Sequence, residues 1–439
     1  MGYIEYNIDN TKGRIENDKL KPICRKSDKD FTRDRKLTPK DIVLYTLNNR
    51  GKTTKMELYD FMKEYDIDEV SAPALLKQRK KLNEEVFKML AKESLNDFYG
   101  KFQDEVKTLK GYVLCAIDGS DCEVPNTKET RKRYKSIEAT DEDRVARIKL
   151  SNCFDVLNHY VLDTLIEEYK HSELDLADKH IENIKYIKEY FPIIKVMDRG
   201  YFSLARFYHW IKNNEKFVVR LNKKYLKAEQ QSMTSDDEIV EIKYQYDRIR
   251  NYKDKDEEFY NYYENGSTIK LRFVNITLPT GEVETLLTNL PMDEFTSEDI
   301  NHIYQCRWGV EINYHELKES MEVTNISSSN DTIIKQEIYS QMFVYNMVAS
   351  IENDLNTRIE QTKYKHPMKV NFNMAVGFVK RFLIKILVEE DDSRRKKLTD
   401  ELFDNILKNL IPIRKNRHFE RDKNRKLTNK HPINKRKSI

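Results

Sequence analysis

Long apolar runs are absent from this chain of 439 residues. No segment approaches the roughly 18 consecutive apolar residues that a membrane-spanning helix needs. The first ten residues, MGYIEYNIDN, lack the apolar centre of a secretion signal. The five cysteines contain no CxxC pair, and their odd number argues against a disulfide framework and against a zinc site. These absences predict a soluble, cytoplasmic protein with no membrane partner.

Net charge is also small, at +4, although 35% of the residues are charged. The charge is unevenly distributed, because the stretch from Arg414 to the C-terminus holds eleven Lys or Arg and two acids, a net of +9. A basic tail at 414–439 favours a polyanionic partner such as nucleic acid. The alternative is a disordered end that only keeps the protein soluble.

The N-terminal part has the pattern of a polar arm followed by short helices. Residues 1–36 are polar and mixed in charge, which predicts a loosely ordered arm. Thr38 as N-cap, Pro39 at the first helical position and Gly51 as a stop then predict a helix. The segment TTKMELYDFMKEY predicts a second helix. With 39% apolar residues, the whole chain is long enough for two or three domains.

A third helix, SAPALLKQRKKL, begins at Ser71 and carries Lys77, Arg79 and Lys80. Three short helices with a basic third helix resemble a helix-turn-helix module, and we expect these three basic residues to contact DNA. The alternative is a helical bundle that only packs on the next domain.

The pattern changes to strands from residue 112. YVLCAID ends in Asp118, two further strands surround a turn near Asn158, and IIKVMDRGYF contains a second buried run that ends in Asp198. This alternation of strands and helices predicts a mixed α/β sheet. Residues 222–286 are predicted to form a β-rich insertion, with a hairpin signal at Asn265-Gly266. The chain after residue 325 is predicted to be mostly helical.

A polar stripe follows the predicted helix YQCRWGVEINYHELK. At about 100° per residue, Tyr304, Arg307, Glu311 and Lys318 fall within roughly 60° of one another along about 21 Å. A solvated helix face is the ordinary explanation. The alternative is a surface that holds phosphates on either side of a carboxylate.

Three carboxylates are candidate metal ligands. Asp118 and Asp198 each end an apolar strand, at the edge of an α/β sheet where sites are usually assembled, and Glu311 lies on a helix that can pack across that edge. Grouped carboxylates repel one another unless cations lie between them, and hard oxygen ligands suit Mg²⁺ or Mn²⁺. A pair of such ions supports in-line attack at a phosphodiester.

The spacing Tyr304-x-x-Arg307-x-x-x-Glu311-x-x-x-x-x-x-Lys318 matches the Y-R-E-K signature of the DDE transposases of bacterial insertion sequences, the insertion-sequence-four family. AIDGSD resembles that family's first catalytic aspartate motif, and VMDRGYFS resembles its second. The resemblance extends over about 99–345.

The resemblance implies an α/β fold with a ribonuclease-H-like mixed sheet core, interrupted by the β-rich insertion and flanked by N-terminal and C-terminal helical regions. It implies that Asp118, Asp198 and Glu311 hold two divalent ions and that Tyr304, Arg307 and Lys318 contact DNA. The domains implied are an arm (1–36), a helical DNA-binding domain (37–98), the catalytic core (99–221 and 287–360), the insertion (222–286), a C-terminal helical region (361–413) and the basic tail (414–439).

The implied reaction is strand cleavage at the ends of the element, followed by attack of the freed 3′-hydroxyls on target DNA. The partners implied are double-stranded DNA, namely transposon ends and target, and a second copy of the chain in a homodimer on that DNA. The protein would be cytoplasmic, in a bacterium, and associated with the nucleoid.

Several residues leave alternatives open. Relatives use a tryptophan in the insertion to stack on a flipped base, but the two tryptophans here, Trp210 and Trp308, lie outside it. Tyr244 or Tyr262 would have to stack instead. Asp121 and Glu123 compete with Asp118 as the first metal ligand. His315 either contacts DNA or is merely exposed. Arg199 either contacts a phosphate or neutralises Asp198.

Three functions are compatible with these patterns. The first is an active cut-and-paste transposase. The second is a catalytically silent, transposase-derived DNA-binding regulator. The third is a nuclease on the same core, which would need neither the phosphate stripe nor the long C-terminal helical region.

Overall fold

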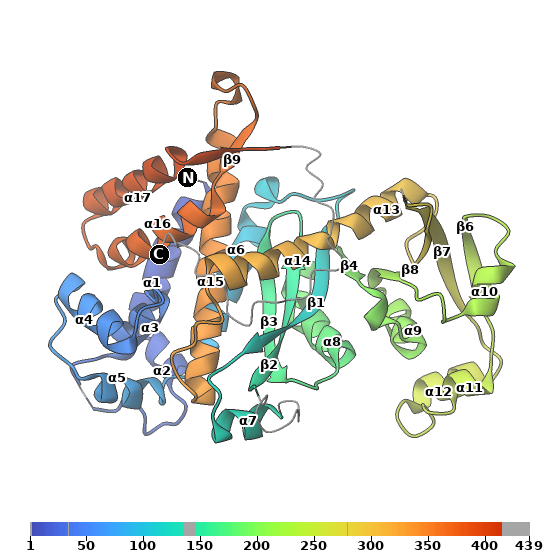
Figure 1. The fold of residues 1–439 in the computed structure, drawn as a ribbon, viewed down its shortest axis with the longest axis horizontal. Coiled ribbons are helices and arrows are strands. Elements are labelled where there is room, and N and C mark those ends of the chain that lie inside the picture. The colour runs from blue at the N-terminus through green and yellow to red at the C-terminus, as the bar shows by residue number, and fades with distance from the viewer. Residues whose placement is uncertain (1, 34, 136–144, 279, 415–439) are drawn as a thin grey trace, which may run out of the picture. The chain divides into compact units, whose positions relative to one another are not determined.

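The computed structural model describes residues 2–33, 35–135, 145–278 and 280–414. The chain divides into two compact units, each assembled from separate stretches (Figure 1). The sheet unit comprises Leu95–Glu123 and Tyr134–Tyr314. The helical unit comprises Met1–Ser94, Val124–Arg133 and His315–Ile439. Three boundaries between them fall within α6 (Glu85–Lys101), α7 (Lys128–Tyr134) and α14 (Trp308–His315), and the fourth follows Glu123.

The sheet unit contains an eight-stranded sheet with the strand order β3-β2-β1-β4-β5-β8-β7-β6. β1 is parallel to β4, and β4 is parallel to β5, whereas the other neighbours are antiparallel. The strands are β1 (Val113–Glu123), β2 (Arg147–Asp155), β3 (Tyr160–Glu168), β4 (Ile193–Met197), β5 (Lys216–Arg220), β6 (Asp237–Ile242), β7 (Ile269–Thr277) and β8 (Val283–Thr288).

The sheet is covered by helices whose apolar residues it buries. β4, with the sequence IIKVM, is buried along its whole length, as expected for a central parallel strand. α8 (Glu173–Asn183) packs on β1, β2 and β3, while α13 (Ser297–Cys306) packs on β4, β5 and β7. α9 (Leu204–Lys212) buries Phe207 and Trp210. The predicted α/β fold class, a mixed sheet with helices packed on it, is confirmed.

The insertion is less purely β than its sequence predicts. β6, β7 and β8 extend the core sheet through the antiparallel pairing of β8 with β5, and α10 (Lys227–Ser232), α11 (Tyr246–Ile249) and α12 (Glu257–Glu264) lie between the strands. The prediction of a hairpin at Asn265-Gly266 is wrong. The preceding residues form α12, which buries Phe259 and Tyr263, and Gly266 adopts a φ of +82° just after the helix ends.

The helical unit surrounds one long helix, α15 (Asp331–Arg358), drawn in orange in Figure 1. α1 (Tyr3–Glu16), α3 (Pro39–Leu47) and α16 (Phe372–Val388) all pack on α15. The unit is completed by α2 (Leu20–Cys24), α4 (Thr54–Glu64), α5 (Ala72–Arg79), α17 (Asp392–Leu407) and the paired strands β9 (Met368–Val370) and β10 (Leu410–Pro412). The sequence predicts separate helical regions at the two ends of the chain, whereas in the structure these regions form one compact unit.

Helix starts in this unit follow the capping signals of the sequence. The Thr38 side chain accepts a hydrogen bond from the N–H of Asp41, whose carboxylate accepts in turn from the N–H of Thr38, and Pro39 is the first helical residue. The Ser71 side chain caps α5 by accepting a hydrogen bond from the N–H of Ala74. All three predicted N-terminal helices are therefore present.

The expected loosely ordered arm at 1–36 is wrong for its first part, because α1 and α2 occupy 3–24. Ile4, Ile8 and Ile15 recur at helical spacing and are buried. α1 contacts α15 and α16, so apolar residues near opposite ends of the chain meet in one core. The basic tail lies, after Arg414, outside the described residues.

Candidate active site

Asp118 and Asp198 occupy corresponding positions on the adjacent parallel strands β1 and β4. The register pairs Val113 with Ile193 and continues in step to Ala116 with Val196, so the same offset brings Asp118 level with Asp198. Neighbouring strands lie about 4.8 Å apart. The two aspartates therefore share one edge of the sheet.

The two aspartates differ in how their strands continue. Asp198 directly follows the last residue of β4, as predicted, and its Oδ1 accepts a hydrogen bond of 2.7 Å from the N–H of Gly200. The expectation that Asp118 ends its strand is wrong, because β1 continues to Glu123, paired with β2. Asp118 instead marks the point where the fully buried part of β1 ends.

The carboxyl of Asp118 has an unfavourable environment for negative charge. Its pKa is raised to about 6, mainly by burial and also by the nearby carboxylates of Asp198 and Glu173, against the opposing effects of the Gly119 N–H and the charge of Arg307. A carboxyl group so placed gains from a nearby cation.

Glu173, which the sequence analysis missed, is a fourth acid beside this edge. It is the first residue of α8, and a Cβ added at Gly119 would lie 2.9 Å from its Oε1, so the Glu173 carboxylate lies directly against β1 at Gly119. Lys149 on β2 lies 3.0 Å from Glu173 and neutralises part of its charge. Nothing in a charged helix far along the chain from Asp118 signals this approach.

Glu311 is paired with a cation from its own helix. Nη2 of Arg307 donates a hydrogen bond of 2.7 Å to Oε1 of Glu311. Arg307 is 9% exposed, and its guanidinium lies 5.7 Å from the ring of Tyr304 and 5.4 Å from the ring of Trp308. Arg307 also interacts electrostatically with Asp118. The guanidinium therefore provides positive charge beside both carboxylates.

The helix that carries the stripe is not uniform. α13 and α14 run end to end (Figure 1), and residues Glu316–Ser320 then wind as a π-helix. Because a π-helix has more residues per turn than an α-helix, the ideal α-helical angle no longer describes Lys318. Lys318 belongs to the helical unit, whereas Tyr304, Arg307 and Glu311 belong to the sheet unit.

The residues at the sheet edge fit a divalent cation by their chemistry. Asp118 and Asp198 supply oxygen ligands from neighbouring strands. The phenol oxygen of Tyr201 is buried, has no hydrogen-bond partner in the described structure, and lies in the field of Glu173, Asp118 and Asp198. Among the residues that the structure describes, however, no three His, Cys, Asp or Glu side chains are grouped closely enough to hold a metal. Glu311 instead faces Arg307.

Residues 109–347, more than half of the chain, match the family model of the transposase DDE domain. The chain belongs to this family. The predicted resemblance to transposases of the insertion-sequence-four type is thereby confirmed. Members of the DDE family use divalent metal ions in general.

A curated relative is the transposase InsG for insertion sequence element IS4 from Escherichia coli (strain K12). It is 23% identical over 280 residues, which cover 62% of this chain and 59% of that protein, so the match spans about three fifths of the relative's length. A solved structure of a piggyBac transposase synaptic complex with hairpin DNA has a TM-score of 0.44 at 8% identity, covering 91% of this chain and 85% of that chain.

Two acids of the DDE domain that compete with Asp118 are engaged elsewhere. Asp121 faces Lys149 across β1 and β2 at 3.2 Å, and Glu123 faces Arg147 at 3.1 Å. Cross-strand ion pairs of this kind stabilise a sheet and explain both acids without a metal.

The remaining predicted contacts around the DDE domain differ in accessibility. Arg199 is exposed and lines a cavity of about 120 Å³ with Arg220 and Lys223, which pair with Glu284 and Glu282. His315 is exposed. The candidate stacking residues Tyr244 and Tyr262 are both partly exposed on the insertion, whereas Trp210 is buried and Trp308 is 47% exposed beside Arg307.

In the helical unit, the predicted DNA contact is contradicted for one of the three basic residues. Lys77 and Lys80 are exposed, but Arg79 is only 2% exposed. Its Nη1 lies 3.0 Å from Oε1 of Glu337, and its Nε donates to Oε1 of Gln336. A guanidinium that is buried and paired in this way holds α5 to α15 and is not presented to DNA.

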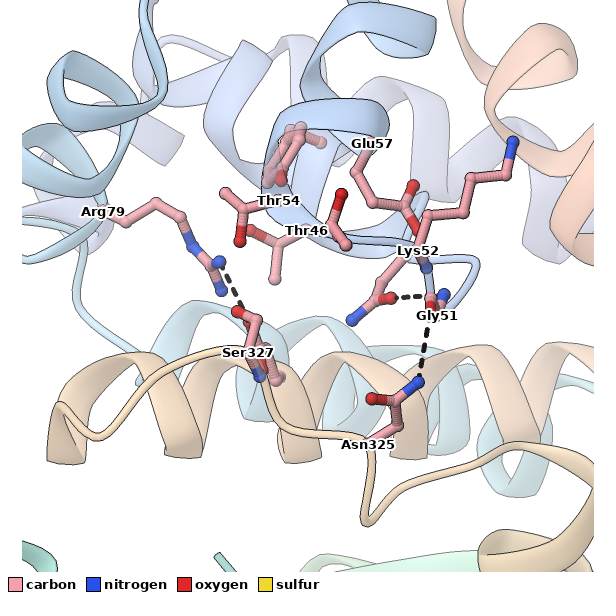
Figure 2. A pocket seen from close by; sticks show the side chains of 12 residues that line it. Thr46, Gly51, Lys52, Thr54, Glu57, Arg79, Asn325 and Ser327 are labelled. Carbon is pink, nitrogen blue, oxygen red and sulfur yellow. Dashed lines mark hydrogen bonds and ion pairs between the residues drawn. The ribbon is translucent and has the colours of Figure 1, made fainter. Parts of the chain in front are cut away.

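Arg79 also lines a cavity of about 320 Å³ between the start of α4 and the segment that precedes α15 (Figure 2). The charged residues of the lining are Lys52, Glu57, Arg79 and Glu337, two cations and two acids. Figure 2 shows Lys52 pointing away from the cavity, and its Nζ lies 2.7 Å from Asp60. Because the lining carries no excess positive charge, this cavity is not a ready site for phosphate.

No helix within the described residues is long and apolar enough to cross a membrane.

Proposed function

We propose that this protein is an active DNA transposase that binds the terminal inverted repeats of an insertion sequence, cleaves the strands there and joins the freed 3′-hydroxyls to target DNA. The observation that carries the proposal is the register of β1 and β4, which brings Asp118 level with Asp198 in a chain of the DDE family. The protein would act in the bacterial cytoplasm, associated with the nucleoid, as a homodimer on the DNA.

Asp118, Asp198 and Glu311 are the proposed ligands of two ions, Mg²⁺ or Mn²⁺. When bound, such a pair supplies Lewis acidity for in-line displacement at a phosphodiester. The buried Tyr201 hydroxyl and the raised pKa of Asp118 support a cation at this edge. In the absence of the ions, Arg307 compensates the charge of Glu311.

The remaining proposed roles concern DNA. Tyr304 and Arg307 contact end phosphates next to the carboxylates, and Lys318 and Arg199 do so from the flanking segments. Lys77 and Lys80 hold the end DNA at the helical domain proposed at 37–98, while the core (99–221 and 287–360) and the insertion (222–286) carry the chemistry. Phosphate contacts of this kind position DNA without reading its sequence.

A catalytically silent, transposase-derived regulator is the second candidate. The ion pair between Arg307 and Glu311, which occupies the third carboxylate, favours it. In such a protein the pair would persist when DNA and metal are present.

A cleavage assay separates the two functions. The substrate is DNA that carries the element's own terminal repeats, incubated with Mg²⁺, Mn²⁺ or EDTA, with wild-type protein and with Asp198→Ala. Metal-dependent nicking at the repeat boundary, lost in the variant, is the expected result. Tight binding to the repeats without nicking in either metal would overturn the transposase proposal in favour of the regulator.

A further inference from the structure

Tyr314 lies three residues beyond Glu311 on α14, and its phenol oxygen bonds to main-chain groups of two neighbouring strands. Its Oη lies 2.8 Å from the main-chain oxygen of Asp118 and 3.1 Å from that of Leu150, and it accepts a hydrogen bond of 2.9 Å from the N–H of Asn152. Asn152 is the residue that faces Asp118 across β1 and β2. One hydroxyl therefore joins the helix of Glu311 to the strand of Asp118 at the level of Asp118 itself.

The neighbouring residue provides a second attachment. Oδ1 of Asn313 accepts a hydrogen bond of 3.1 Å from Nδ2 of Asn152, and both side chains are completely buried. Oδ1 of Asn152 in turn accepts from the hydroxyl of Thr164 on β3 at 2.8 Å. α14 is thus fixed to β1 and β2 by directional hydrogen bonds.

The phenol oxygen itself is not needed to fill space. A phenylalanine would occupy almost the same volume, and burying a hydroxyl is unfavourable unless it is hydrogen-bonded. Here the hydroxyl engages main-chain groups on both sides of the Asp118 strand pair. Such bonds fix the position of α14 relative to the two strands. They therefore also fix the position of Glu311, which lies one helical turn from Tyr314.

We propose that Tyr314 is a positioning residue, which fixes the helix that carries Glu311 to the strand that carries Asp118, so that both carboxylates can serve one divalent cation. The inference rests on the proposed function, because it takes Asp118 and Glu311 as ligands of that cation. Groups that orient metal ligands typically contribute roughly 10- to 100-fold to metal affinity or activity.

The test compares Tyr314→Phe with Tyr263→Phe in the full chain. Tyr263 is a matched control, because it is also a buried tyrosine whose hydroxyl bonds main-chain oxygens, those of Ile242 and Lys243, but it lies in the insertion. Mn²⁺ binding is measured without DNA, by the electron paramagnetic resonance of the free ion. Cleavage of repeat-bearing DNA, binding of that DNA in EDTA and the melting temperature are measured beside it.

We expect Tyr314→Phe to weaken Mn²⁺ binding about 10-fold and to slow cleavage at sub-saturating Mn²⁺ similarly. DNA binding in EDTA should stay within about twofold of wild type. Tyr263→Phe should lower the melting temperature comparably and leave Mn²⁺ binding unchanged. Unchanged Mn²⁺ affinity in Tyr314→Phe, or an equal loss in both variants, would overturn the proposal.

A second variant covers the case in which Tyr314→Phe does not fold. Asn313→Ala removes the other attachment and leaves the phenol in place, and it should weaken Mn²⁺ binding in the same direction. Unchanged binding in that variant would then overturn the proposal. If wild-type protein neither binds Mn²⁺ nor cleaves, the proposed function fails instead, so the two failures are distinct.

Discussion

The carboxyl of Asp118 is surrounded by groups of both signs, and its charge state follows from their balance. Burial and the acids Asp198 and Glu173 act against its ionisation, while Arg307 acts for it. A site of this kind is costly to keep ionised without a cation, and the cost can be measured in the metal-free protein.

Stability in EDTA should therefore depend on pH through Asp118. Its folded pKa, about 6, lies above the ordinary value of about 3.9, so the folded state holds the proton more tightly. Stability then falls as the pH rises from about 4 to 6, by up to roughly 2–3 kcal/mol. Asp118→Asn should melt above wild type at pH 7 and close to it at pH 4. A constant difference across this range would contradict the assignment.

Glu311→Gln should lower the rate of strand cleavage roughly 100-fold or more, because it removes a charged oxygen ligand. Binding to the ends should stay intact, because the side chain keeps nearly the same volume. The measurement is cleavage and gel-shift binding on the same repeat-bearing DNA. Retained cleavage would remove Glu311 from the metal site.

At the scale of elements, the packing of a helix decides which of its basic side chains are exposed. α5 presents Lys77 to solvent but buries Arg79 against Glu337 of α15. The two residues lie two positions apart on one short helix, so they form a matched pair for mutation.

Arg79→Ala should destabilise the protein by roughly 3–5 kcal/mol, because it leaves a buried carboxylate unpaired. Lys77→Ala should leave stability within about 0.5 kcal/mol and reduce the salt dependence of DNA binding. Chemical denaturation and binding at several salt concentrations measure both. A reduced salt slope for Arg79→Ala in folded protein would restore its predicted DNA contact.

Lys318, within the π-helical segment, provides the test of the polar stripe. Lys318→Ala should weaken binding to repeat-bearing ends and lower the salt slope by about one. Binding isotherms between low and physiological salt measure this slope. If the slope is unchanged, the last part of the stripe is a solvated face.

The sequence predicted the elements whose signals are local. Apolar runs ending in Asp118 and Asp198, and the caps at Thr38 and Ser71, could be identified because each signal lies within a few residues. The hairpin prediction at Asn265-Gly266 fails because a dipeptide that commonly closes a hairpin can also follow the end of a helix. The environments of Arg79 and Glu173 depend on partners far away in sequence, Glu337 and Gly119, which no local pattern indicates.

At the scale of the whole molecule, both units are discontinuous in sequence. The helical unit combines α1 and α3 with α15 and α16, and Nζ of Lys12 donates to the main-chain oxygen of Leu387. The family model spans 109–347 and thus covers most of the sheet unit and only part of the helical unit.

This interleaving sets an order for folding during synthesis. Residues up to Tyr314 complete the sheet unit, whereas α1 must wait for α16, which begins at Phe372. At about 5–20 residues per second, the first helices emerge roughly 20–70 s before their packing partners. A ribosome that stops before α16 would therefore release a chain with its sheet complete and with the part of α1 that packs on α16 still uncovered, a substrate for chaperones and proteases.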